Sequence, residues 1–364
     1  MKKLYSLITL VILLTVALQV SAQSSSSSSD NSGFDQLIKS TPGDATKLFQ
    51  AFANPLFKGF GVGLNSGWNN TAQTKKFLHF DIRITANVAQ VPTSDKSFDV
   101  TQIGLSNHVT PDASSPTKIA QTFGGDKNAP TPKLDIWNDA HTQIVTTFDM
   151  PKGVIEYIPA PNVQVTVGLI KNTDVTIRTT PTINLGSDAG SIGMFGFGFK
   201  HNIVQDFAKK GVPKPFDLAI AVNYNRITYN KPLSVTPDAG AQPANPSQST
   251  DFSNQHINAT FSGLNFQAII SKKLLFFTPF ASVGYQTANQ DLGVYGNFPI
   301  TSDKIAGTQY YTTYKDPIHI TGTSISGLRG DVGFQMNLLL LRIYASYSVG
   351  GGYNSANAGI GLGF

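Results

Sequence analysis

The chain has 364 residues with 13% charged and 40% hydrophobic residues, and its net charge is +5. So weak a charge, without a basic run, argues against a nucleic-acid partner. The sequence contains no cysteine, which excludes disulfide bonds and a lipid anchor attached to cysteine.

The first residues have the three parts of a secretory signal. Lys2 and Lys3 precede an apolar run over residues 4–20, and Val20-Ser21-Ala22 offers the small residues of a cleavage site. We therefore expect an exported protein whose signal peptide, residues 1–22, is removed. An uncleaved membrane anchor is the alternative, which the short apolar run disfavours.

The segment after the signal is rich in serine. Residues 23–43 contain a polyserine tract and predict a flexible tether. Residues 44–55 predict a short helix, because Asp44 can cap it and apolar residues gather on one side. Pro55 is expected to end this helix. The helix is a possible plug for the rest of the chain.

From residue 56 onward the hydrophobic pattern has a period of two. In residues 77–91 apolar side chains alternate with polar ones, so a strand places the two sets on opposite faces. No run of 18 apolar residues occurs after the signal, so no transmembrane helix is predicted. A chain that spans a membrane without helices must form a closed barrel.

We predict an all-β fold, a transmembrane antiparallel β-barrel over residues 56–364. One face of each strand is apolar and the other is polar or small, which is typical of outer-membrane barrels. The predicted count is about twelve strands, with fourteen as the alternative. The strands are placed at residues 57–67, 77–91, 97–105, 163–169, 174–178, 191–200, 216–229, 257–271, 274–288, 324–335, 341–350 and 353–364.

One of these strands rests on parity. Bacterial barrels have an even number of strands, and residues 97–105 supply the twelfth. The long connections, residues 106–161, 230–256 and 290–323, are expected to be outer loops. The chain stops at Phe364 in an alternating strand, an ending that the barrel-assembly machinery recognises. We expect a monomer in the outer membrane of a Gram-negative bacterium, with outer-membrane lipid and that machinery as partners.

Two stretches resemble a known pattern. Residues 49–91, with Ala53-Asn54-Pro55-Leu56-Phe57-Lys58-Gly59-Phe60-Gly61, are similar to an uncharacterised family of bacterial outer-membrane β-barrel proteins, as are residues 158–174. This resemblance implies location and fold, and it brings no activity. A more distant resemblance is to the long-chain fatty-acid transporters of the outer membrane, whose N-terminal segment plugs the barrel. Only the helix expected before the first strand supports it.

Chemistry-bearing motifs are nearly absent from the sequence. The six histidines are dispersed, without metal-ligand spacing, and no hydrolase or phosphate-binding motif occurs. We therefore expect no enzyme, no catalytic residue, no metal and no cofactor. The useful candidates are polar side chains on the lumen-facing register, which either brace the wall or line a path for solute. They are His79, Asp81, Arg83, Asn87, Asp174, Arg178, Asp217, Arg329, Asp331 and Arg342.

The leading hypothesis is an outer-membrane barrel that acts as a channel or transporter for a small or hydrophobic solute. A general porin is disfavoured, because open porins usually have about 16–18 strands. The alternatives are a structural or surface-interaction barrel without transport, an outer-membrane enzyme with a rim histidine or serine, and a soluble periplasmic β protein.

Overall fold

A computed structural model describes residues 37, 40–184, 190–207 and 214–364. The expected signal peptide and most of the expected tether lie outside these residues. Residues 33–364 form one compact unit. Among the helices described, none is long and apolar enough to cross a membrane.

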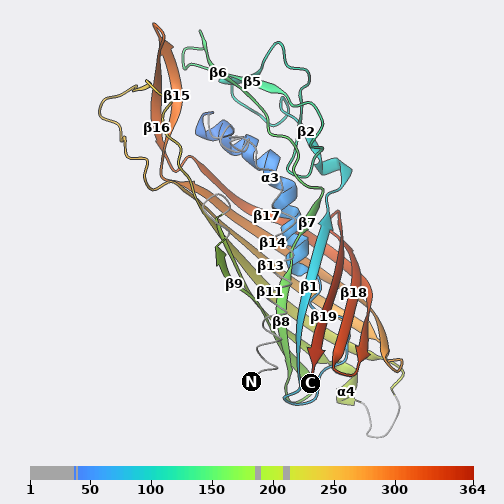
Figure 1. The fold of residues 1–364 in the computed structure, drawn as a ribbon. Helices are drawn as coiled ribbons and strands as arrows, with labels where there is room; N and C mark the ends of the chain where they lie inside the picture. Colours follow the sequence, from blue (N-terminus) through green and yellow to red (C-terminus); the bar gives the residue numbers. More distant parts are fainter. Residues whose placement is uncertain (1–36, 38–39, 185–189, 208–213) are drawn as a thin grey trace. The chain divides into compact units, whose positions relative to one another are not determined.

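Ten antiparallel strands form a closed barrel (Figure 1). Pairing between the first and last strands closes it, from Asp81 opposite Gly363 to Gln90 opposite Asn354. The strands are β1 (Phe80–Gln90), β8 (Asn162–Gly168), β9 (Thr173–Asn184), β10 (Ser191–Asn202), β11 (Asp217–Pro232), β13 (His256–Ser271), β14 (Phe277–Tyr295), β17 (Ile318–Leu338), β18 (Leu341–Gly350) and β19 (Tyr353–Gly363). The short β7 (Tyr157–Pro159) also pairs with β1, beyond the end of β8.

The predicted barrel is confirmed, but the count of twelve is wrong, as is the alternative of fourteen. Residues 57–65 belong to a helix, and residues 66–67 follow its end. Residues 97–105 contain only β2 (Ser97–Asp99), which pairs outside the barrel with β4 (Ile119–Gln121). Parity alone had placed a strand there. The strand count stays even because two of the twelve predicted strands are absent. β1 begins beside the end of β19, where Phe80 and Phe364 exchange two backbone hydrogen bonds.

The two ends of the barrel differ. At the turn end, short connections join β8 to β9, β13 to β14 and β17 to β18, and α4 (Ile203–Phe207) lies between β10 and β11. At the loop end, residues 91–156 carry η2 (Thr93–Asp95), β2, β3 (Val109–Pro111), β4, β5 (Lys133–Trp137) and β6 (Ile144–Asp149). A hairpin of β15 (Asn297–Ile305) and β16 (Thr308–Lys315) also lies there, and β12 (Gln242–Pro243) pairs with β16.

The long helix α3 (Pro42–Asn65) runs from the loop end into the barrel (Figure 1). It contacts β1, β11, β13, β14, β17 and β19. The predicted helix over residues 44–55 was too short, because the helix continues through Pro55. The alternation of glycine with apolar residues after Pro55 fits a strand, but it also fits a helix that must enter a narrow lumen.

The glycines of α3 explain this fit. A Cβ on Gly61 would lie 2.7 Å from the Cβ of Ala288 in β14, and one on Gly63 would lie 2.6 Å from that of Ala160. A glycine inside a helix costs about 1 kcal/mol relative to alanine. In return, the absence of a side chain at these positions lets the helix backbone approach the wall more closely than any other residue would allow.

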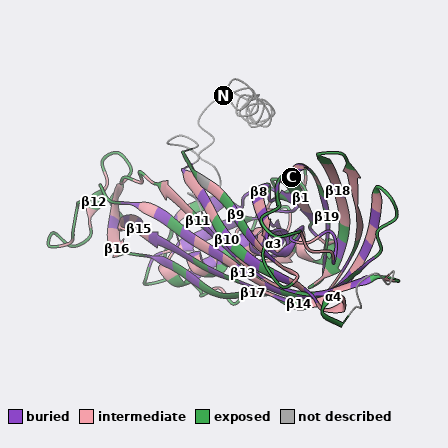
Figure 2. Ribbon diagram, turned by 90° about the horizontal axis from the view of Figure 1, so that it is seen from below, coloured by how far each residue is buried: buried purple, intermediate pink, exposed green. Residues whose placement is uncertain are grey.

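The barrel wall is apolar outside and changes character inside. Along β1, β11, β13 and β19 buried residues alternate with more exposed ones (Figure 2). The outward residues include exposed Phe195, Phe197 and Phe199 of β10. Towards the loop end the inward side chains are apolar, and residues such as Phe261 and Leu292 join α3 in the main hydrophobic cluster. Towards the turn end the inward side chains are polar and buried.

Candidate functional site: the occupied lumen

The candidate site is the lumen itself, together with the chain segment that occupies it. After α3 ends at Asn65, residues 66–76 continue through the polar half of the barrel towards the turn end. There the Lys75 amide donates a hydrogen bond to Asp174 Oδ1 at 2.8 Å, and the next residues lead into β1. We call residues 42–76 the plug.

Three arginines from separate strands meet the plug where α3 ends. Arg83, Arg178 and Arg329, here called the arginine cluster, come from β1, β9 and β17, and all are buried. The last carbonyls of a helix have no partner within the helix, and the dipole places partial negative charge there. Cationic donors from the wall therefore match what this end of α3 presents.

Arg178 makes the most direct contact with the helix end. Its guanidinium donates to the carbonyl of Leu64 at 3.1 Å and to that of Ser66 at 3.2 Å. It also lies 3.9 Å from the centre of the Trp68 ring, a cation–π contact. A third bond reaches Gln164 Oε1 at 3.1 Å. Carbonyl dipoles and an aromatic face thus stabilise a fully buried cation.

Arg83 and Arg329 hold the residues next to the helix end. Arg83 donates to the Gly67 carbonyl at 2.8 Å and to Asn70 Oδ1 at 2.5 Å, and also to the Trp68 carbonyl. Arg329 donates to Ser66 Oγ at 2.9 Å and pairs with Asp331 at 2.7 Å. The three arginines therefore hold the plug between residues 64 and 70, through backbone carbonyls and through the side chains of Ser66 and Asn70.

Neutral amides complete the contacts at this level. Asn225 of β11 donates to the Leu64 carbonyl, and Asn265 of β13 donates to the Asn65 carbonyl at 2.9 Å. Asn65 in turn donates to the Thr287 carbonyl of β14 at 3.1 Å. The end of α3 is therefore bound from most of the circumference of the barrel.

A second set of contacts lies nearer the turn end. Lys200 donates to the carbonyls of Thr71 and Gln73 at 3.1 and 2.7 Å, and its ammonium lies 3.2 Å from Asp174 Oδ2. Ser271 Oγ accepts from the Ala72 amide at 2.9 Å and lies 3.2 Å from Thr71 Oγ1. These polar contacts hold the lower plug without any covalent link.

The polar lumen is filled at this level. Arg178, Asn225 and Gln286 have 0% of their surface exposed, although they point into the barrel. The barrel wall has ion pairs of its own, since Arg342 donates to Asp81 at 2.6 Å and Tyr344 donates to the same carboxylate at 2.7 Å. The inward charges thus serve two roles, namely bracing the wall and holding the plug.

The structure places most of the sequence-derived candidates together. Arg83, Arg178, Asp174, Asp217 and Arg329 contact the plug. Asp81, Asn87, Asp331 and Arg342 bond mainly to the wall. His79 differs, because it precedes β1 and is exposed. Lys200, Asn225 and Asn265 were missed, although all lie on the inward register of strands that were predicted.

A polar group at the turn end consists of Asn172, His201 of β10 and Asp206 of α4. Hydrogen bonds from Asn172 at 3.1 Å and His201 at 2.7 Å lower the pKa of the Asp206 carboxyl below its ordinary value of 3.8. These bonds join α4 to the neighbouring turn. Within the described residues, no group of three or more histidine, aspartate or glutamate side chains could hold a metal ion.

Several solved structures are similar to this chain at low identity. The outer-membrane protease OmpT from Escherichia coli is 9% identical, covers 81% of this chain and 100% of its own, and has a TM-score of 0.32. The outer-membrane transporter YddB from Escherichia coli is 10% identical, and the match covers 75% of this chain and 39% of YddB with a TM-score of 0.29. The translocator domain of autotransporter NalP from Neisseria meningitidis is 10% identical, and the match covers 88% of this chain and 97% of that domain with a TM-score of 0.28.

These similarities are too low to assign an activity. Among curated proteins, none matches the chain. A family model, by contrast, matches residues 1–364 in full. The predicted resemblance to an uncharacterised barrel family is confirmed, and the chain belongs to the family of unknown function DUF6588.

Proposed function

We propose that this protein is an outer-membrane β-barrel whose lumen is closed by the plug, and that it admits a small or hydrophobic solute when the plug moves. The observation that carries the proposal is the plug itself. Residues 42–76 occupy the barrel as one continuous segment and are held by hydrogen bonds from wall arginines and asparagines. Such bonds can break and re-form without altering the wall.

The placement in the outer membrane is supported by the two faces of the wall. In the half where inward residues are polar, outward residues such as Phe197, Ile220 and Phe266 are exposed and apolar. This is the arrangement of outer-membrane barrels. The turn end would face the periplasm, because β1 begins and β19 ends there.

The solute class is proposed from the dimensions of the barrel. The interior of a barrel of about eight strands is just wide enough for side chains or one small ligand. A barrel of ten strands is only slightly wider, so displacement of the plug would open a passage that is still narrow. The apolar inward face towards the loop end, which includes Phe261, favours a hydrophobic solute there.

Single-channel recording with a locked plug tests the proposal. The hydroxyl oxygens of Thr71 and Ser271 lie 3.2 Å apart, so cysteines at these positions are within reach of a disulfide after a small shift. The chain has no other cysteine. The oxidised Thr71→Cys/Ser271→Cys barrel is expected to be silent in a planar bilayer, and reductant should restore the currents of the wild type. Equal currents in both states would refute a moving plug.

A structural barrel without transport is the second candidate, and one observation favours it. The N-terminal half of α3 is packed against residues 91–156 of the loop end as well as against the wall. Phe52 and Phe123 stack edge to face at 6.1 Å, and Ser106 donates to Asp44 at 2.8 Å. This packing favours permanent closure, and silence of the reduced as well as the oxidised variant would support it.

We also propose that the protein is not an enzyme. The group most like a catalytic one is Thr173, His201 and Asp206, in which Thr173 Oγ1 lies 3.0 Å from His201 Nδ1. The Thr173 hydroxyl also donates to the Lys171 carbonyl at 3.0 Å, whereas a nucleophile must give its proton to the base. Hydrolysis of ester or peptide substrates that Thr173→Ala abolishes would contradict this.

A further inference from the structure

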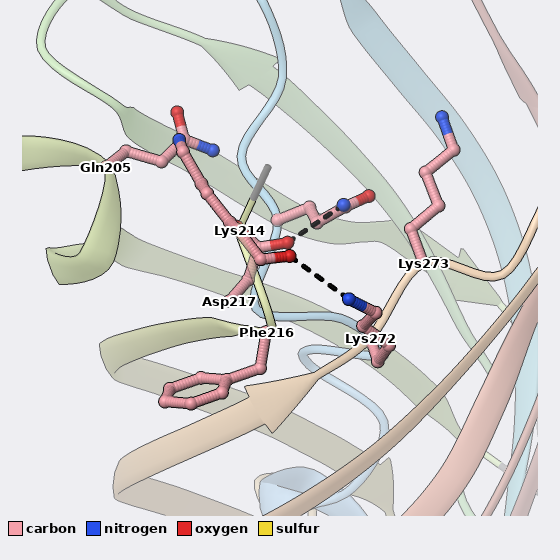
Figure 3. Close-up of a pocket in the computed structure, with 7 residues that line it drawn as sticks. Gln205, Lys214, Phe216, Asp217, Lys272 and Lys273 are labelled. Atoms are coloured by element: carbon pink, nitrogen blue, oxygen red, sulfur yellow. Dashed lines mark hydrogen bonds between the residues drawn. The ribbon is translucent and has the colours of Figure 1, made fainter. Parts of the chain in front are cut away.

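The turn end carries a cavity that the plugged-barrel proposal does not use. The lysine cavity, of about 240 Å³, lies between the start of β11 and the β13–β14 turn. It is lined by Gln73, Gln205, Lys214, Phe216, Asp217, Lys272 and Lys273. Figure 3 shows Lys272 directed at the Lys214 carbonyl, to which it donates at 3.1 Å.

The cavity has an excess of positive charge. Its one carboxylate, Asp217, already accepts hydrogen bonds from Gln73 and Asn202, both at 2.9 Å. Within the described part of the chain, Lys214, Lys272 and Lys273 form no ion pair. Ammonium groups without a carboxylate partner at a rim are suited to an anion with several oxygens, such as a phosphate.

A second feature lies on the outer wall of the same strands. The wall groove, of about 610 Å³, is lined mainly by apolar residues of β10, β11, β13 and β14. One row of the groove follows from the register, in which the small Ala268 pairs with Ile220 on one side and Val283 on the other. The row above it contains Phe266 and Tyr285. A small residue framed by large ones leaves a channel in the apolar surface.

The register connects the two features. Ser271 is buried inside the barrel, so Lys272 continues the outward row of Ile270 and Ala268. At about 3.3 Å per residue, Ala268 lies about 13 Å above Lys272. An acyl chain could therefore run in the groove while the phosphate to which it is esterified lies among the lysines.

The rim next to the lysines is itself apolar. Leu275 is 88% exposed at the tip of the β13–β14 turn, and Leu339 is fully exposed at the adjacent β17–β18 turn. The two turns are joined by a hydrogen bond from the Asn337 amide to the Phe276 carbonyl. Leucine tips beside lysines are suited to the boundary between acyl chains and headgroups, where lysine keeps its charge in the polar layer.

We propose that the lysine cavity and the wall groove together bind one anionic glycerophospholipid, with its phosphate at Lys272, Lys273 and Lys214 and an acyl chain over Ala268. The site rests on the outer-membrane placement proposed above. It requires no motion of the plug.

Native mass spectrometry of the detergent-purified barrel tests the site, with phosphatidylglycerol and phosphatidylcholine as probes. The wild type should retain one phosphatidylglycerol and bind phosphatidylcholine more weakly. Lys272→Gln/Lys273→Gln should weaken phosphatidylglycerol binding by about tenfold or more, because each basic side chain near an anionic headgroup contributes appreciably. Ala268→Phe should weaken it too, by filling the groove.

Two matched variants control for general effects. Lys127→Gln/Lys133→Gln removes the same charge from exposed lysines at the loop end, and Ala358→Phe enlarges an exposed alanine on β19. Both should bind as the wild type does. Equal binding by all variants would overturn the site. Binding of inorganic phosphate that Ala268→Phe leaves unchanged, without retained lipid, would show a free-anion site instead. A normal heat-modifiable band for each variant would separate loss of this site from loss of the barrel.

Discussion

Arg178→Met should release the plug. In the wild type, the Ser66 carbonyl and Gln164 Oε1 accept from Arg178, whereas the Leu64 carbonyl has additional donors in Trp68 and Asn225. Methionine fills similar volume but donates nothing. Two buried oxygens would then lack a donor, at about 1–3 kcal/mol each. Methionine also avoids the desolvation cost of a buried cation, which offsets part of this loss. We therefore expect plug binding to weaken by about 3 kcal/mol.

The assay is labelling of Ala72→Cys, since Ala72 is fully buried and the chain has no native cysteine. When opening is fast relative to labelling, the rate is proportional to the population of the open state. A loss of about 3 kcal/mol raises that population roughly a hundredfold. Arg226→Met is the matched control, because this arginine is exposed and its hydrogen bond to Thr260 is long, at 3.5 Å. An unchanged or slower rate in Arg178→Met would refute the assigned role of the arginine cluster.

Other contacts give three further predictions. Gly61→Val should reduce the yield of folded barrel, because its Cβ would lie 2.7 Å from that of Ala288, and Ala288→Gly should partly restore the yield on a heat-modifiability gel. Asp81→Asn should lower the temperature of barrel unfolding by removing the partner of Arg342, a loss of about 3–5 kcal/mol, whereas Asp291→Asn at an exposed pair should have little effect. Because its folded pKa is lowered, Asp206 should stabilise the α4 contact above about pH 4 and lose this effect as the pH falls through its folded pKa; a nuclear magnetic resonance titration that shows an ordinary pKa would contradict the contact.

Strand periodicity was sufficient to predict most of the barrel. In β1, β11 and β19 the alternation of apolar and polar residues marks which side faces outward, and the register of the structure agrees. It failed at residues 57–67, where small residues alternate with large ones. That pattern describes a surface in close contact, and both a strand and a tightly enclosed helix satisfy it.

The candidate site could be predicted only in part. The inward register identified Arg83, Arg178 and Arg329, because charges on the lipid side are costly. The plug partners of Arg83 and Arg178 are mainly backbone carbonyls, and a carbonyl carries no sequence signal. The helix end that attracts them was also hidden, because Pro55 was expected to end the helix well before Asn65, where it does end.

The most direct test of an occupied lumen is a cross-link in the native membrane. The Ser66 and Ser355 hydroxyl oxygens lie 3.0 Å apart, one on the plug and one on β19. In Ser66→Cys/Ser355→Cys, oxidation of an outer-membrane fraction should give a disulfide-linked pair of peptides by mass spectrometry in most of the folded, heat-modifiable protein. A folded barrel in that fraction in which both thiols remain free and react with a soluble maleimide would contradict the account.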